Sequence, residues 1–186
     1  MTLCFKSAIV SAMDFYILQV ETGHEAGFIE KVKKLSPELS QKYNLIYLTR
    51  ELTIRRQGKW LKEQQPVFPG YVIMQTTSSI DSKTLLAFKA VPGFYHFLKS
   101  NTEITPLAGN DLFIIQHFLD LGPKIGSSLV KFDENDRIVV IEGPLKGIEG
   151  NIIKVDRRKQ RTKIRVDFGG SSHTMDLSFE DISKQG

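Results

Sequence analysis

The chain of 186 residues carries 25 Lys and Arg against 21 Asp and Glu, so its formal net charge is only +4. This balance excludes a histone-like polycation, and 41% hydrophobic with 25% charged residues is typical of a folded soluble chain. The single cysteine, Cys4, permits neither an internal disulfide nor a cysteine-rich zinc site, which favours a cytoplasmic protein. No stretch approaches the ~20 apolar residues of a membrane span, so we expect no membrane partner.

The first strand-like run begins directly after Met13. We therefore expect residues 1–13 to be a short N-terminal extension. A weak signal peptide is the minority alternative, because the apolar stretch is interrupted by serines and is shorter than a usual signal core.

Residues 14–121 have the pattern of an α+β unit. Phe15-Tyr-Ile-Leu-Gln-Val20 predicts a strand. An amphipathic helix follows from His24, with Phe28, Val32 and Leu35 at helical spacing.

Alternating apolar residues from Ile46 to Ile54, followed by a turn at Gln57-Gly58-Lys59, predict a long hairpin. The continuous apolar run Tyr71-Val-Ile-Met74 predicts a central strand that is buried on both faces.

Two further helices are expected in this unit, with a short strand between them. The first covers residues 81–90 with Leu85, Leu86 and Phe88 on its buried side; the strand covers residues 94–98. The second covers residues 111–121, capped by Asn110, and is apolar over most of its girth, so it should pack between layers.

Glycine, proline and serine gather in residues 122–131, which we expect to be a linker. Residues 132–186 contain four or five short strand patterns separated by glycine turns, and no helical period. Within residues 162–168, apolar and charged side chains alternate strictly. This segment therefore predicts a small β-barrel.

Enzymatic residues are not evident. The four histidines lie in different predicted elements, and neither a zinc-binding H-E-x-x-H, a G-x-S-x-G nor a phosphate-binding glycine loop is present. We expect no catalysis, no metal and no cofactor.

Phe68-Pro69-Gly70-Tyr71 is more informative, because proline and glycine together produce a kink at the entry to a strand. Such a kink can place both rings on one surface, and Tyr16, Phe94 and Phe97 would join them if their strands lie alongside. The functional interpretation is an apolar patch for a partner helix. The alternative is that the rings fill the core.

A basic cluster lies between two strands of the predicted barrel. Residues 154–165 carry seven basic residues and one acid, a net +6, whereas the rest of residues 131–186 carries −5. Exposed on a hairpin loop, this cluster can contact RNA phosphates and release counterions. The alternative is a solvated loop. The candidate RNA-binding residues are Lys154, Arg157, Arg158, Lys159, Arg161 and Lys163.

These motifs resemble the NusG family of transcription elongation factors. The opening strand with Thr22-Gly-His-Glu25, the Phe68-Pro-Gly-Tyr-Val72 signature and Val91-Pro-Gly-Phe94 resemble its N-terminal domain. Asp136 to Asp156 resembles a KOW module. The implied fold is an α/β sandwich, with an antiparallel sheet and about three helices, linked to a small KOW β-barrel.

The resemblance implies a monomeric, non-enzymatic antitermination factor that binds the clamp of the largest RNA polymerase subunit and promotes processive elongation. Residues matching the positions that line the clamp-binding depression are Tyr16, Phe68, Pro69, Tyr71 and Phe97. Non-template DNA is a further possible partner.

Within the family, Arg157-Arg-Lys-Gln-Arg161 is most similar to the LoaP group of antiterminators, whose KOW module helps bind a hairpin in nascent RNA. Three alternatives remain: a housekeeping factor whose KOW module binds Rho or a ribosomal protein, a ribosome-associated RNA module, and an enzyme.

Overall fold

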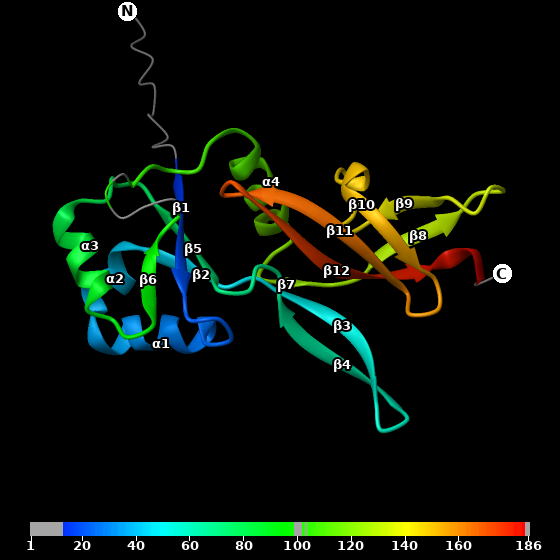
Figure 1. Ribbon diagram of the computed structural model, residues 1–186, viewed down its shortest axis with the longest axis horizontal. Coiled ribbons are helices and arrows are strands. Elements are labelled where there is room, and N and C mark those ends of the chain that lie inside the picture. The colour runs from blue at the N-terminus through cyan, green and yellow to red at the C-terminus, as the bar shows by residue number, and fades with distance from the viewer. Residues whose placement is uncertain (1–12, 99–101, 103, 185–186) are drawn as a thin grey trace, which may run out of the picture.

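The computed structural model describes residues 13–98, 102 and 104–184. Residues 1–12 of the expected N-terminal extension lie outside this range. Figure 1 shows an N-terminal sheet with helices at one end of the molecule, a C-terminal sheet at the other, and a two-stranded hairpin that projects between them.

The N-terminal sheet has four antiparallel strands in the order β2-β5-β1-β6. Their bounds are Asn44–Ile46 for β2, Tyr71–Thr76 for β5, Asp14–Val20 for β1 and Phe94–Phe97 for β6. As the sequence predicts, β5 is an inner strand, and Val72, Ile73 and Met74 are buried. It pairs with β1 over six residues, which is the longest pairing of this sheet.

Three helices cover one face of this sheet: α1 (Glu25–Leu35), α2 (Pro37–Lys42) and α3 (Ser82–Lys89). Phe28 and Val32 of α1 are buried against the sheet as expected, whereas Leu35 is exposed. The next helix begins only two residues later, at Pro37.

Helix α3 is capped by Asp81, whose Oδ1 accepts a hydrogen bond from the Thr84 backbone N–H at 2.7 Å. This cap satisfies one of the helix's unpaired donors. Phe88 is buried, but Leu86 is exposed, so the prediction of its buried side is wrong for Leu86. Thr84 takes an inward position instead and shares a hydrogen bond with the Tyr43 hydroxyl at 2.9 Å.

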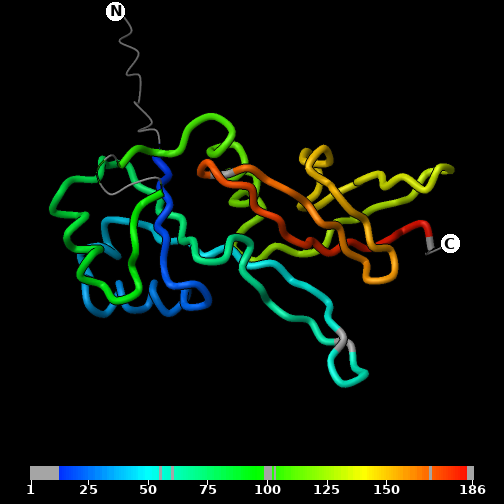
Figure 2. Tube along the Cα trace, in the orientation of Figure 1, coloured from blue at the N-terminus to red at the C-terminus, as the bar shows by residue number. Residues whose placement is uncertain are grey.

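The predicted hairpin consists of β3 (Thr49–Arg56) and β4 (Lys59–Pro66), joined at Gln57-Gly58. Both turn residues have positive φ, 50° and 80°, as the favoured two-residue hairpin turn requires. A short parallel strand, β7 (Lys124–Ile125), pairs with the first two residues of β3. The rest of the hairpin, here called the arm, extends away from the N-terminal sheet (Figure 2).

The C-terminal sheet has five strands in the order β10-β11-β12-β8-β9. Their bounds are Ile152–Asp156, Arg161–Phe168, Ser171–Asp181, Ser128–Phe132 and Ile138–Glu142, respectively. Short 3-10 helices cover Glu149–Asn151 and Ile182–Lys184. The expected linker over residues 122–131 contains β7 and most of β8, so this sheet begins at Ser128.

Helix α4 (Gly109–Asp120) lies between the two sheets, as its apolar girth predicts. Ile114, Ile115 and Phe118 are buried. Asn110 does not cap it: its Nδ2 donates to the Asp167 carbonyl of β11 at 3.3 Å. The residue therefore ties the helix to the C-terminal sheet.

One apolar core runs from the uncovered face of the N-terminal sheet, beneath α4, into the C-terminal sheet. It includes Ile17 and Phe68 on one side and Val166 and Met175 on the other. The strict alternation predicted for β11 is confirmed, since Ile164 and Val166 are buried while Lys163 and Arg165 are exposed.

The fold class is therefore the predicted α/β sandwich followed by a small β unit that curves as a half-barrel. The expectation of about three helices falls one short, because the six-residue α2 was not anticipated. Its Pro37 stands at the first helical position, where the missing N–H costs no hydrogen bond.

A buried carboxylate fixes the turn that leads into β5. Glu25 Oε1 accepts from the backbone N–H of Gly70 at 2.6 Å and of Gly23 at 3.1 Å, and only 1% of the residue is exposed. Gly70 has φ of 83°, and a Cβ there would lie 2.8 Å from Thr22 Oγ1. Only glycine fits this position.

We predict that Gly70→Ala lowers the free energy of unfolding by about 2–5 kcal/mol, since it adds a steric clash to left-handed strain. Gly58→Ala is the matched control, because Gly58 has a similar φ of 80° and a Cβ there would meet no described atom within 4 Å. We expect only the strain cost there, about 1–2 kcal/mol. Chemical denaturation measures both; equal losses would contradict the clash.

Candidate nucleic-acid interface and aromatic face

The aromatic residues predicted to bind polymerase lie on two opposite faces of the N-terminal sheet. Phe68 is 4% exposed and Tyr71 is half-buried, and both pack in the core shared with the C-terminal sheet. Tyr16 and Phe97, 3% and 1% exposed, pack on the other face beneath the helices. Pro69 is exposed at the turn. The five residues therefore do not share one surface.

Strand register explains this division. Tyr71 pairs with Gln19 of β1, whereas Tyr16 pairs with Met74 of β5. Successive side chains of a strand point to opposite faces, so Tyr16 and Tyr71 fall on different sides of the sheet. Burial also raises the pKa of the Tyr16 hydroxyl, with a smaller contribution from Asp14, so the phenol stays protonated.

The face that carries Phe68 and Tyr71 is covered by α4 and by His173 of β12. The His173 ring stands edge-on to Tyr71, with centroids 5.6 Å apart, and to Phe68 at 6.3 Å. Phe118 of α4 packs edge-on to Phe68 at 5.6 Å. A partner that binds this face has to replace these contacts.

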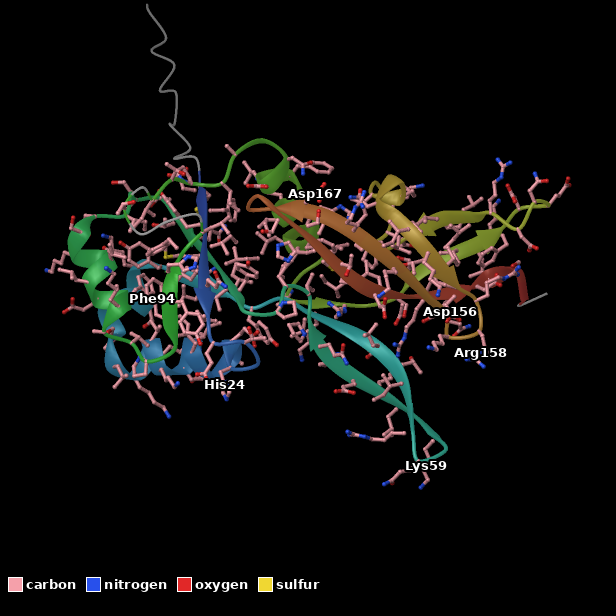
Figure 3. All side chains as sticks on the ribbon, in the orientation of Figure 1. His24, Lys59, Phe94, Asp156, Arg158 and Asp167 are labelled. Carbon is pink, nitrogen blue, oxygen red and sulfur yellow. The ribbon has the colours of Figure 1, made fainter. Side chains whose placement is uncertain are left out.

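The predicted basic loop is the turn between β10 and β11. Asp156 Oδ1 accepts from the Lys159 backbone N–H at 2.9 Å, and this hydrogen bond holds the pKa of that carboxyl below its usual value. Gln160 has φ of 51°, and its carbonyl accepts from the Phe179 N–H at 3.0 Å. The loop is thus fixed at both ends, and Figure 3 shows Arg158 at its tip.

Four of the six predicted RNA-binding residues surround one pocket of about 180 Å³ beside this loop. Its lining consists of Lys154, Lys159, Arg161 and Lys163 with two carboxylates, Asp156 and Asp176. The formal charge of the lining is four minus two, or +2. We call it the basic pocket.

Strand pairing builds the basic pocket. Lys154 of β10 and Lys163 of β11 are register partners, and Asp176 of β12 is the partner of Lys163 on the other side. Directly opposed side chains lie on the same face of a sheet. Asp176 pairs with Lys163 Nζ at 3.4 Å and with Arg161 at 4.0 Å, and so holds both cations at the pocket.

Arg157 lies apart from the pocket. Its guanidinium carbon stands 3.9 Å from the centroid of the Phe132 ring, and its nitrogens lie 2.5 Å from Asp136 Oδ1 and 3.7 Å from Asp181 Oδ2. Three contacts from three segments join the loop to β8, to the turn before β9 and to the end of β12. The arrangement is that of a structural clamp.

Arg161 makes a second, unexpected contact. Its guanidinium donates to the carbonyl of Thr53 in β3, and the Ser178 hydroxyl donates to the carbonyl of Glu51 at 3.0 Å. The sequence gives no signal for these contacts, because more than 100 residues separate the partners. Asp176 was also missed; its place opposite Lys163 follows only from the strand register.

Within the described residues, no group of three or more histidine, cysteine or acidic side chains could hold a metal ion. None of the helices in the described part of the chain is both long and apolar enough to cross a membrane.

Comparison with known proteins places the chain among transcription factors. The transcription termination/antitermination protein NusG of Pasteurella multocida is 25% identical over 174 residues, 91% of this chain and 94% of that protein. For the protein of the same name from Bacillus subtilis the identity is 23% over 175 residues, covering 92% and 98%.

A solved structure on domain interaction in Thermotoga maritima NusG has the same fold, with a TM-score of 0.54 and 20% identity over 90% of this chain and 94% of that one. Residues 13–116 match the family model described as transcription termination factor NusG, which is more than half of the 186 residues. The chain therefore belongs to the NusG family.

Proposed function

We propose that this chain is a non-enzymatic antitermination factor of the cytoplasm. Its N-terminal unit, residues 14–121, binds the clamp of RNA polymerase and promotes processive elongation, and its C-terminal unit, residues 132–186, contacts nascent RNA. The observation that carries the proposal is the convergence of four basic side chains on the basic pocket in a member of this family.

The RNA contact is supported by charge and geometry. Lys154, Lys159 and Lys163 are exposed, and their ammonium groups can each neutralise a phosphate and release its counterion. The loop that carries Lys159 is already ordered by Asp156, so little conformational entropy is lost when it binds.

The polymerase contact is supported by the apolar face around Phe68 and Tyr71. Glu25 fixes the turn that carries both rings, so the face is preorganised. His173 and α4 cover it, and a clamp helix therefore reaches it only when both the C-terminal unit and α4 move away. Tyr16 and Phe97 pack on the opposite face of the sheet, beneath the helices. A direct polymerase contact by either remains a prediction.

For the RNA contact, we predict that Lys159→Gln with Lys163→Gln weakens binding of a fluorescein-labelled RNA hairpin about tenfold at low salt. The slope of log affinity against log salt should fall by about 2, one unit for each lost phosphate contact. Lys33→Gln with Lys34→Gln on α1 removes the same charge elsewhere and should change neither. Equal effects of the two pairs would contradict a site at the pocket.

Arg157 should behave differently from its neighbours. We predict that Arg157→Lys lowers the free energy of unfolding by about 1–2 kcal/mol, because it loses the stacking on Phe132 and the reach to two carboxylates. RNA affinity should change less than about twofold. Arg158→Lys, at the exposed tip, is the matched control and should leave stability unchanged. A large loss of RNA affinity in Arg157→Lys with unchanged stability would contradict this structural role of Arg157.

For the polymerase contact, we predict that Tyr71→Ala reduces co-purification of core polymerase at least about tenfold with a native circular dichroism spectrum, as loss of a central aromatic contact does. Tyr95→Ala is the control, since Tyr95 is 55% exposed on the far strand β6. Equal retention of polymerase by both variants would contradict the assignment.

His173→Ala tests whether His173 covers the face around Phe68 and Tyr71, and its expected effect on polymerase binding is opposite to that of Tyr71→Ala. It removes two edge-on ring contacts, each worth about 0.5–1.5 kcal/mol, so polymerase binding should strengthen several-fold.

Binding of Rho or of a ribosomal protein, with no RNA binding, would instead favour the housekeeping alternative.

A further inference from the structure

The tip of the arm carries an unexplained concentration of positive charge. Residues 55–62 contain four basic residues and no acid, so this one segment has a formal charge of +4, equal to that of the whole chain. Arg56 and Lys59 are exposed and face each other directly across the hairpin. Like charges at directly opposed positions destabilise a strand pair, so this pair does not serve the stability of the arm.

The turn itself does not require these cations. Gln57-Gly58 supplies the two positive φ angles on which the hairpin depends. Lys62 differs from the pair, because it forms an ion pair with Glu51 at 2.7 Å. Arg56 and Lys59 therefore stand out as the cations that the arm presents to a ligand.

The arm is joined to the C-terminal sheet at the edge of the basic pocket. Arg161 and Ser178 are register partners on β11 and β12, and they donate to the carbonyls of Thr53 and Glu51 on β3. A two-stranded hairpin alone is only marginally stable in water, so these bonds help to hold the arm in place. Arg161 belongs to the lining of the pocket and to this joint at once.

The distance along β3 gives the separation between the arm tip and the Arg161–Thr53 contact at the edge of the basic pocket. Arg56 lies three residues beyond Thr53, which is about 10 Å at the rise of an extended strand. Figure 3 shows Lys59 and Arg158 at the ends of two hairpins that diverge from this joint. Cations thus lie on both of these hairpins, the arm and the hairpin that contains the β10–β11 loop.

We propose that, in the chain that is not bound to polymerase, the arm tip and the basic pocket bind one structured RNA together, with Arg56 and Lys59 on its backbone phosphates. The inference rests on the proposed RNA contact and extends it to the N-terminal unit. Point charges that contact phosphates position a nucleic acid without reading its sequence. The arm therefore adds affinity to every RNA that the pocket accepts.

The test uses the full chain and a fluorescein-labelled RNA hairpin with a 12-base-pair stem. Arg56→Gln with Lys59→Gln should weaken binding about tenfold at low salt and lower the salt slope by about 2. Lys33→Gln with Lys34→Gln again removes an equal charge as a control. A combined variant of the arm pair and the pocket pair, Lys159→Gln with Lys163→Gln, should lower the slope by about 4.

Each outcome separates this inference from the function on which it rests. If the pocket pair weakens RNA binding while the arm pair behaves as the α1 control, the RNA contact stands and the joint site is wrong. If the unaltered chain does not bind the hairpin, both are wrong. Equal binding of a DNA hairpin of the same sequence would overturn the assignment to RNA. Native circular dichroism and unchanged thermal unfolding of the arm variant exclude a loss through misfolding.

Discussion

Ile17, Phe68 and Phe118 pack in one continuous core with Val166 and Met175, so the N-terminal and C-terminal sheets each bury an apolar face against the other part. Burial of apolar surface is the dominant favourable term in such a contact. The shared core sets the positions of everything at its margin: it brings β12 alongside β3, where Arg161 and Ser178 reach backbone carbonyls, and it leaves the arm and the β10–β11 loop outside. The aromatic face is hidden and the basic regions are exposed for the same reason.

Local patterns predicted most of the elements. The alternation in β11, the apolar run of β5 and the Gln57-Gly58 turn each depend on neighbouring residues, and the structure confirms all three. The predictions are wrong where contacts with a more distant part of the chain determine the position of a side chain. Leu35 and Leu86 have helical spacing but face outward, because the sheet contacts only part of each helix. Asn110 has the chemistry of a cap, yet it bonds to Asp167, which lies 57 residues away.

The candidate sites were predictable only as far as strand register allowed. A shift of one residue between paired strands moves every side chain to the other face, so the sequence did not establish whether Tyr16 and Tyr71 share a surface. Composition identified the basic cluster, but it did not show which of its residues line the basic pocket and which contact other segments. Lys154 and Lys163 meet through strand pairing, whereas Arg157 turns to Phe132, and the joint between Arg161 and Thr53 depends on the packing of both sheets.

The pairing of β12 with β8 has a consequence for synthesis of the chain. Phe179 pairs with Ser128, so the C-terminal sheet lacks its central pairing until Phe179 has left the ribosome. The strands of the N-terminal sheet end at Phe97, and domains generally fold as units from the N-terminus. During synthesis of the remaining chain, at about 5–20 residues per second, the face around Phe68 is therefore without its C-terminal cover for several seconds. That interval exposes the nascent chain to aggregation and gives a partner early access to the face.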